Sequence, residues 1–192
     1  MVLSRPDILK YLKEGKLRFD PEIDCDAQVA QVSVDLYLSR KFTVLKDPPP
    51  YLTSIQVDHS LWDSADLWEH NESDVYVLEP KQFVLAQTLE SVSMPPDLVG
   101  LVEGRSSWAR VGVSIHITAP KIDPGFNGPI TLEMANLGRV PVVLKAKVHK
   151  PAQLILLQVS TPLTEGELYG AGPHDAFQRQ SEPIPRKKKR SN

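Results

Sequence analysis

The sequence predicts a mainly β protein with a short N-terminal helix, and three observations support this prediction. Short runs of β-branched and other apolar residues recur at a spacing of roughly ten residues between turn residues, as in β-sandwiches and β-barrels. The segment Val32–Leu38 alternates apolar with mostly polar residues, which is the period of a strand with one buried face. The 17 prolines argue against long helices.

The first element in chain order is a capped helix. Ser4 is followed by Pro6 and Asp7, an apolar run comes next, and Gly15 stands where the helix would end. Alternation and β-branched content then predict strands, with turn residues between them. The predicted strands are Val32–Leu38, Lys41–Leu45, Val75–Leu78, Phe83–Leu89, Leu98–Glu103, Val111–Ile117, Ile130–Asn136, Val142–Lys145 and Leu154–Val159.

The length and composition favour one domain followed by a tail. The 192 residues, 41% of them hydrophobic, are enough for a single sizeable core. We expect this domain over residues 1–168 and the tail over residues 169–192.

Two segments differ from the rest in composition. Residues 46–71 hold three consecutive prolines and several acidic residues, so we expect an excursion or arm rather than a core strand. Its large apolar residues should pack it onto the domain or a neighbouring subunit; they are Leu61, Trp62, Leu67 and Trp68. The basic run Arg186–Arg190 predicts a solvated, disordered end over residues 186–192 rather than a nucleic-acid contact.

Charge and cysteine content exclude several function classes. The net charge of −2 gives no reason to expect DNA, RNA or an anionic membrane as a partner. The single cysteine, Cys25, excludes an internal disulfide framework and a Cys-rich zinc site, and it fits a reducing compartment. No apolar run resembles a signal peptide or a membrane span, so we expect a cytoplasmic protein.

The stretch Gly104–Glu133 carries the chemistry. It joins a Gly-Arg-Ser-Ser turn, an Asp-Pro-Gly turn and a strand with a carboxylate. Guanidinium groups, hydroxyls and turn N–H groups all suit phosphate oxygens, which suggests a polyphosphate ligand. The phosphate-loop and dinucleotide signatures are missing from the sequence.

Two familiar mechanisms fit the sequence poorly. A serine nucleophile, Ser106 or Ser107, with His116 as its base is conceivable, but the G-x-S-x-G elbow is missing. Zinc-dependent base deamination needs a histidine and two cysteines, and the chain has one cysteine. Base chemistry here would therefore use a water activated by a carboxylate, near hydroxyls and carbonyls.

Three motifs, GRSSWAR, ITAPKIDPGFNGPITLE and SVDLYL, together resemble the deoxycytidine triphosphate (dCTP) deaminase family, a branch of the trimeric dUTPase fold. The resemblance implies a distorted antiparallel β-barrel of the β-clip type, assembled as a homotrimer with sites between subunits. It also implies metal-free hydrolytic deamination of dCTP to dUTP and ammonia on the route to dTTP. Magnesium is expected only as the counter-ion of the triphosphate.

The same resemblance assigns the catalytic roles. Glu133 matches the glutamate that takes a proton from the attacking water and returns one to the pyrimidine. Ser106 and the backbone carbonyl of Ala119 would hold that water, and Arg110 matches the family's essential arginine. Ser106 and Arg110 would come from one subunit and Glu133 from the next.

The remaining assignments concern substrate binding. Arg105, Ser106 and Ser107 resemble the phosphate-holding turn, which Trp108 and Ala109 complete or shape. Asp123 corresponds to a residue that contacts the deoxyribose, and Thr131 and Leu132 flank the base. Residues 169–180 form a possible lid, whose Tyr169 and Gln180 match the phosphate-contacting tail residues; Ala176 replaces the usual lysine between them.

Other readings stay open at the level of sequence. The IDPGF turn around Asp123 resembles a dUTPase motif, so a dUTPase or a bifunctional deaminase and dUTP pyrophosphatase is an alternative. A nucleotide-binding regulatory trimer, with dUTP or dTTP as product or regulator, is another.

Overall fold

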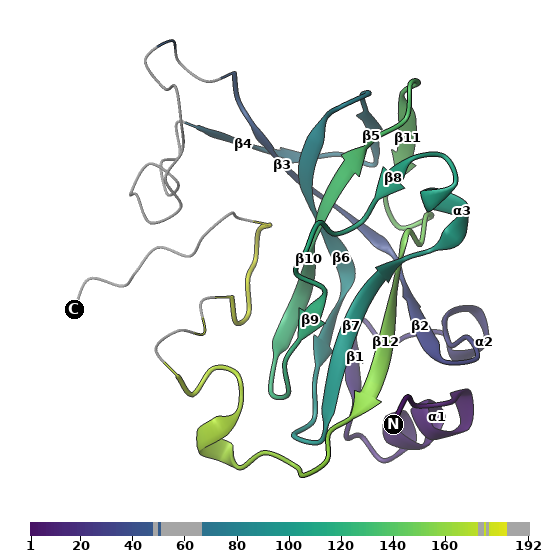
Figure 1. The fold of residues 1–192 in the computed structure, drawn as a ribbon, viewed down its shortest axis with the longest axis vertical. Coiled ribbons are helices and arrows are strands. Elements are labelled where there is room, and N and C mark those ends of the chain that lie inside the picture. The colour runs from purple at the N-terminus through teal and green to yellow at the C-terminus, as the bar shows by residue number, and fades with distance from the viewer. Residues whose placement is uncertain (48–49, 51–66, 173–174, 176, 184–192) are drawn as a thin grey trace.

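The computed structural model describes residues 1–47, 50, 67–172, 175 and 177–183, which form a mainly β fold with few helices (Figure 1). The predictions for Leu61, Trp62, Ala176 and the basic end at 186–192 concern residues outside this part of the chain. No helix in the described part is long and apolar enough to cross a membrane.

In chain order the elements are α1 (Arg5–Lys13), β1 (Arg18–Asp20), α2 (Cys25–Gln28), β2 (Ser33–Leu36), β3 (Leu38–Leu45), β4 (Trp68–Glu72), β5 (Val75–Leu78), β6 (Phe83–Ser93), β7 (Leu98–Gly104), α3 (Ser106–Ala109), β8 (Val113–Ser114), β9 (Lys121–Ile122), β10 (Asn127–Asn136), β11 (Val142–Lys145), β12 (Ala152–Gln158) and the 3-10 helix η2 (Glu165–Glu167).

The strands pair antiparallel in three sheets. The largest has the order β4-β3-β6-β10-β8, with β1 also paired to β6; the second has the order β2-β12-β7-β9; β11 and β5 form the third. The prediction of a mainly β fold is thus confirmed. The strand hydrogen bonds of the described residues form three separate sheets and not the single closed barrel that the resemblance implies.

Strand β10 separates the core from a partly open face. Its side chains alternate, so that Ile130, Leu132 and Met134 are buried in the core while the residues between them are half-buried. β10 pairs with β6 so that Glu133 lies opposite Leu85. This alternation directs Glu133 away from the core.

Several predicted elements change their bounds in the structure. Helix α1 confirms the predicted N-terminal helix, but the Ser4 hydroxyl donates to Asp7 Oδ2 at 2.7 Å and does not cap a backbone N–H group. The predicted strand Val32–Leu38 is divided between β2 and β3, which belong to different sheets, and the break falls at Tyr37. The strand prediction for Val111–Ile117 is wrong over most of its length, because α3 and the turn after it occupy the chain up to Gly112, and only Val113–Ser114 pair with β10.

The expected excursion at residues 46–71 ends in an unpredicted strand. β4 pairs with β3 from Trp68 opposite Leu45 to Glu72 opposite Lys41, so its residues belong to the largest sheet. The packing of the apolar residues onto the domain is confirmed for Leu67 and Trp68, which form a buried cluster with Leu85.

Glu90 is a buried carboxylate on β6, at the corner between β2 and β3, with 2% of its surface exposed. The backbone N–H of Tyr37 donates to its Oε2 at 3.0 Å, and the Gln28 amide donates to its Oε1 at 2.7 Å. Burial raises the pKa of Glu90 above its ordinary value, and these hydrogen bonds offset only part of the rise. The stabilising contribution of the group is therefore present at acidic pH and is lost as the pH rises through the folded-state pKa.

We expect Glu90→Gln to change how stability depends on pH. The free energy of unfolding of the wild type, minus that of the variant, should fall as the pH rises above the ordinary pKa range of a glutamate, because only the wild type must then bury a charge. Urea titrations of both proteins across this range measure the difference. A difference that stays constant with pH would contradict the expectation.

Gly112 joins α3 to β8 in a conformation that favours glycine, with φ of 87°. An added Cβ would lie 2.6 Å from the backbone nitrogen of Gly138. Gly112→Ala should lower the free energy of unfolding by about 1–3 kcal/mol through backbone strain. Gly166→Ala is the matched control, since its added Cβ meets no described atom within 4 Å. Equal denaturation midpoints for the two variants would speak against this account.

Candidate active site

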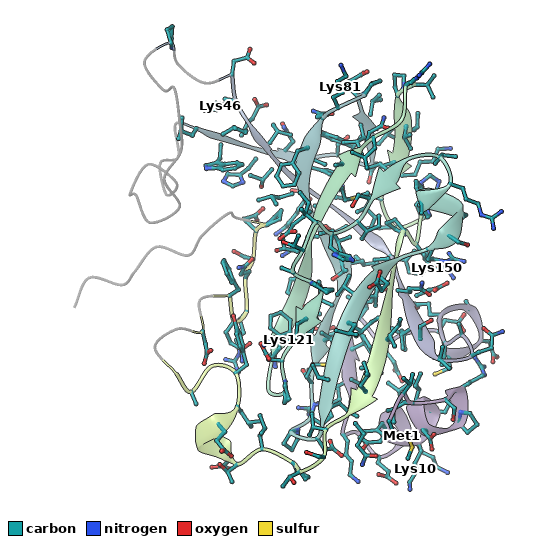
Figure 2. The ribbon with its side chains drawn as sticks, viewed as in Figure 1. Met1, Lys10, Lys46, Lys81, Lys121 and Lys150 are labelled. Atoms are coloured by element: carbon teal, nitrogen blue, oxygen red, sulfur yellow. The ribbon has the colours of Figure 1, made fainter. Side chains whose placement is uncertain are left out.

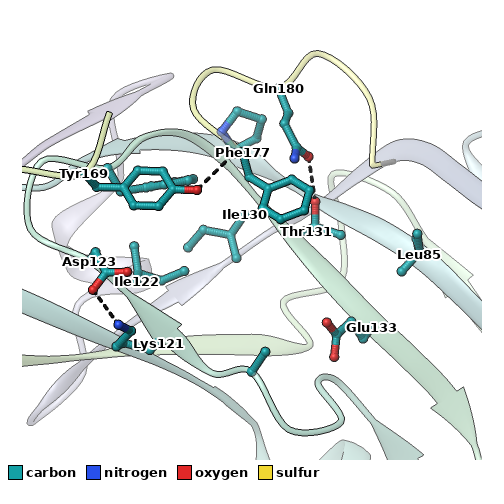
Figure 3. Close-up of a pocket in the computed structure, with 13 residues that line it drawn as sticks. Leu85, Lys121, Ile122, Asp123, Ile130, Thr131, Glu133, Tyr169, Phe177 and Gln180 are labelled. Carbon is teal, nitrogen blue, oxygen red and sulfur yellow. Dashed lines mark hydrogen bonds and ion pairs between the residues drawn. The ribbon is translucent and has the colours of Figure 1, made fainter. Parts of the chain in front are cut away.

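A pocket of about 320 Å³ lies where the outer face of β10 meets the turn between β9 and β10 and the C-terminal segment (Figure 3). Six of the predicted site residues line it: Ala119, Asp123, Thr131, Glu133, Tyr169 and Gln180. Seven further lining residues were not predicted: Leu85, Lys121, Ile122, Phe126, Pro129, Ile130 and Phe177. The pocket thus combines apolar walls with two carboxylates, which suits a ligand that is partly flat and partly polar.

Glu133 reaches the pocket from β10. The backbone N–H of Ile117 donates to its Oε2 at 3.1 Å, which holds the carboxylate beside the segment that carries Ala119. Its Oε1 has no hydrogen-bond partner among the described residues, so this oxygen can still accept a proton from a ligand or a water. A half-buried carboxylate fixed on one oxygen and free on the other is suited to proton transfer.

The other carboxylate of the pocket belongs to the turn after β9. Asp123 lies 2.8 Å from Lys121 Nζ, and Figure 3 shows the pair on one side of the pocket. Gly125 permits the turn with φ of 85°. Lys121 was predictable from its place two residues before Asp123 in the motif ITAPKIDPGFNGPITLE.

The C-terminal segment lines the pocket together with β10. Tyr169 Oη accepts a hydrogen bond from the backbone N–H of Phe177 at 2.9 Å, and the Thr131 hydroxyl donates to Gln180 Oε1 at 3.2 Å (Figure 3). Burial raises the pKa of Tyr169 above its ordinary value. Phe177 could have been suspected from its place between Tyr169 and Gln180 in the tail motif.

Helix α3 carries a second group of predicted residues. Ser106, Ser107 and Arg110 are exposed there, as is the small side chain of Ala109. Trp108 is half-buried and packs edge-on against another ring, with 5.0 Å between ring centroids. A compact row of hydroxyls and a guanidinium at the surface can receive an anion.

Arg105 is held differently from Arg110. Its Nε lies 3.3 Å from Asp35 Oδ2, and its Nη1 donates to the Lys150 carbonyl at 3.2 Å. Burial raises the pKa of Asp35, while Arg105 and Lys150 act in the opposite direction. Arg105 thus anchors α3 to β2, and some of its donors remain available for another ligand.

Within one chain these two groups do not meet. None of the α3 residues lines the pocket. In the view of Figure 2, Lys121 of the pocket is drawn to the left of β7, whereas Lys150 beside α3 is drawn to the right of β12. The side chain of Leu132, 1% exposed, faces the core, so only its backbone can flank a ligand.

The structure does not pair a serine with a histidine base at α3. In the described part of the chain, His116 Nε2 lies 3.4 Å from Glu103 Oε2, and neither Ser106 nor Ser107 bonds to it. Among these residues there is also no group of three or more His, Cys, Asp or Glu that could hold a metal ion.

Residues 2–159 match the family model for dCTP deaminase-like proteins. The chain therefore belongs to the dCTP deaminase-like family. It is an enzyme of the dCTP deaminase kind, as its relatives indicate. The dUMP-forming dCTP deaminase of Halobacterium salinarum is 40% identical over 162 residues, covering 84% of this chain and 83% of that protein. The dCTP deaminase of Halorubrum lacusprofundi is 38% identical over 184 residues, covering 95% of this chain and 89% of that protein.

The fold is similar to that of a solved structure as well. The 2'-deoxycytidine 5'-triphosphate deaminase of Agrobacterium tumefaciens has a TM-score of 0.63 to this chain at 23% identity. The match covers 86% of this chain and 50% of that one, so this chain spans half the length of its structural neighbour. At this level of identity the likeness concerns the fold.

Proposed function

We propose that this protein hydrolyses the exocyclic amino group of dCTP, with Glu133 as the proton carrier, at sites shared between three copies of the chain. The observation that carries the proposal is the position of Glu133 in the pocket, fixed by the Ile117 N–H beside Ala119. The family membership of the chain supports the choice of dCTP.

The proposed reaction needs one group that moves protons in both directions. Glu133 takes a proton from a water, whose oxygen attacks C4 of the cytosine ring. Protons then pass through the same carboxyl to the ring and to the amino group, the C4–N4 bond breaks, and ammonia leaves. Ala119 lines the pocket, and its carbonyl and Ser106 would orient the water.

The pocket of one chain lacks the positive charge that a triphosphate requires. Its only described cation, Lys121, is already paired with Asp123 at 2.8 Å. The exposed Ser106, Ser107 and Arg110 of another copy would supply phosphate donors, with Mg²⁺ as counter-ion of the triphosphate. A homotrimer with heterologous contacts repeats this arrangement three times.

Asp123 and Tyr169 would contact the deoxyribose and the phosphates from the side of the tail. Tyr169 packs on Phe126, with 5.8 Å between ring centroids, and forms an apolar wall with Ile130. Flat apolar surfaces of this kind suit a pyrimidine or a sugar face. Thr131 and the backbone of Leu132 would flank the base.

Glu133→Gln should abolish deamination while leaving the fold intact. We expect kcat for ammonia release from dCTP to fall by at least ~100-fold, because an amide cannot carry the proton. Glu165→Gln is the matched control, since Glu165 is exposed and lies outside the pocket. Coupled ammonia detection with chromatography of the nucleotides measures both variants. Deamination that survives in the Glu133 variant would refute the proposed mechanism.

Mixing two inactive variants tests whether the sites are shared. If Glu133 and Arg110 of one site come from different subunits, co-refolded Glu133→Gln and Arg110→Ala chains should recover about a quarter of wild-type activity, the random share of intact sites. Each variant alone should stay inactive. If both residues came from the same chain, mixing would restore nothing.

A second candidate is the further cleavage of dUTP to dUMP and pyrophosphate. Two observations favour it: the Halobacterium salinarum relative is named dUMP-forming, and Asp123 faces the same pocket. In that case one dCTP and two waters would give dUMP, ammonia and pyrophosphate. Chromatography of the product separates dUTP from dUMP and decides between the two.

A further inference from the structure

One side chain that helps to hold the C-terminal segment over the pocket does not itself line the pocket. Gln178 stands between Phe177 and Arg179, and it is absent from the pocket lining, to which Phe177 and Gln180 belong. Its amide binds three backbone groups from two other parts of the chain. We propose that Gln178 is a positioning residue that docks the tail and sets Phe177 and Gln180 for the nucleotide.

The hydrogen bonds of Gln178 use both N–H donors and the oxygen of its amide. The backbone N–H of Asn127 donates to its Oε1 at 2.7 Å. Its Nε2 donates to the Gly125 carbonyl at 2.9 Å and to the Tyr169 carbonyl at 3.1 Å. Position 178 therefore requires one acceptor and two donors at this reach, which glutamine has and neither glutamate nor a cationic side chain has.

The backbone of the tail also contacts the start of β10. The Arg179 N–H donates to the Asn127 carbonyl at 2.8 Å. The tail passes so close to Gly128 that an added Cβ there would lie 3.2 Å from the Arg179 nitrogen. The tail thus packs directly on the backbone at the start of β10, and Gln178 fixes it to the turn just before.

The loop that leads to Gln178 is closed by its own contacts. Asp175 Oδ2 accepts from the N–H groups of Gly170 and Gly172, each at 2.8 Å, and Tyr169 Oη accepts from the Phe177 N–H. These bonds shape the loop between Tyr169 and Phe177. The Tyr169 N–H joins the start of the loop to the β9–β10 turn through the Pro124 carbonyl at 2.9 Å, and Gln178 and the Arg179 N–H join its far end to Gly125 and Asn127. Beyond the pocket, Lys41 Nζ lies 2.7 Å from Glu182 Oε1, a partly exposed pair of the kind that adds little stability.

The proposal makes a prediction for the free protein. In Gln178→Ala, amide hydrogen exchange at Phe177 and Arg179 should become about tenfold faster or more, because three hydrogen bonds are lost. Gln178→Glu keeps the acceptor and the length but loses both donors, so it should behave like the alanine variant. Gln31→Ala is the control for a glutamine truncation, since its exposed side chain makes no hydrogen bond to the described residues.

The second readout rests on the proposed function. With dCTP, both Gln178 variants should show a KM raised by about tenfold and a smaller change in kcat, because the chemistry at Glu133 is untouched and only the docking of the tail is weakened. Gln31→Ala should match the wild type in both constants.

The outcomes separate the two proposals. Unchanged exchange in both Gln178 variants would overturn the docking role, and faster exchange with an unaltered KM would overturn its link to the nucleotide. A wild-type protein that does not turn over dCTP would contradict the proposed function instead, and the exchange comparison would still decide the role of Gln178 in docking.

Discussion

The antiparallel pairing of β10 with β6 is the constraint on which the candidate site depends. Because side chains alternate along a strand, this register buries Met134 and turns Glu133 outward, and a slip of one residue would exchange them. The register shifts between Pro129 and Thr131, and the N–H of Ile130 donates to the Thr88 hydroxyl at 2.8 Å. The irregularity is therefore satisfied internally and does not weaken the strand that carries the carboxylate.

The two arginines at the ends of α3 have different environments, which the sequence alone does not distinguish. Arg105 is bound to Asp35, which is 8% exposed, and it ties the helix to β2. Arg110 is exposed at the other end. This ion pair, whose carboxylate is buried, orients the short helix, so that Ser106 and Arg110 are presented outward together. The exposed end is then the part of α3 that another copy can reach.

Periodicity predicted the parts of the fold in which one face of an element is buried over several residues. It found α1 and the central part of most long strands, such as β10 and β12. It failed at Val111–Ile117, because a turn occupies the start of this segment and only Val113 and Ser114 pair with β10. It also failed at α3, whose four residues are too few to show a helical period.

The site residues that belong to a motif were predictable from the sequence. Those that are placed by tertiary packing were less so. Asp123, Thr131 and Glu133 come from one motif, and the structure brings them to one pocket. Gln178 acts through backbone groups of a turn about fifty residues away, and hydrogen bonds to backbone leave no pattern in the sequence of the turn. Only the three-dimensional structure shows these hydrogen bonds of Gln178.

The described part of the tail docks over the pocket through contacts that carry no charge. The bonds that hold residues 177–180 are neutral hydrogen bonds to backbone and to Thr131, and they need neither a phosphate nor a cation to form. Salt screens such bonds far less than it screens exposed ion pairs. In the proposed shared site the tail therefore contributes shape and neutral donors, and the positive charge for the phosphates falls to Arg110 of the neighbouring copy.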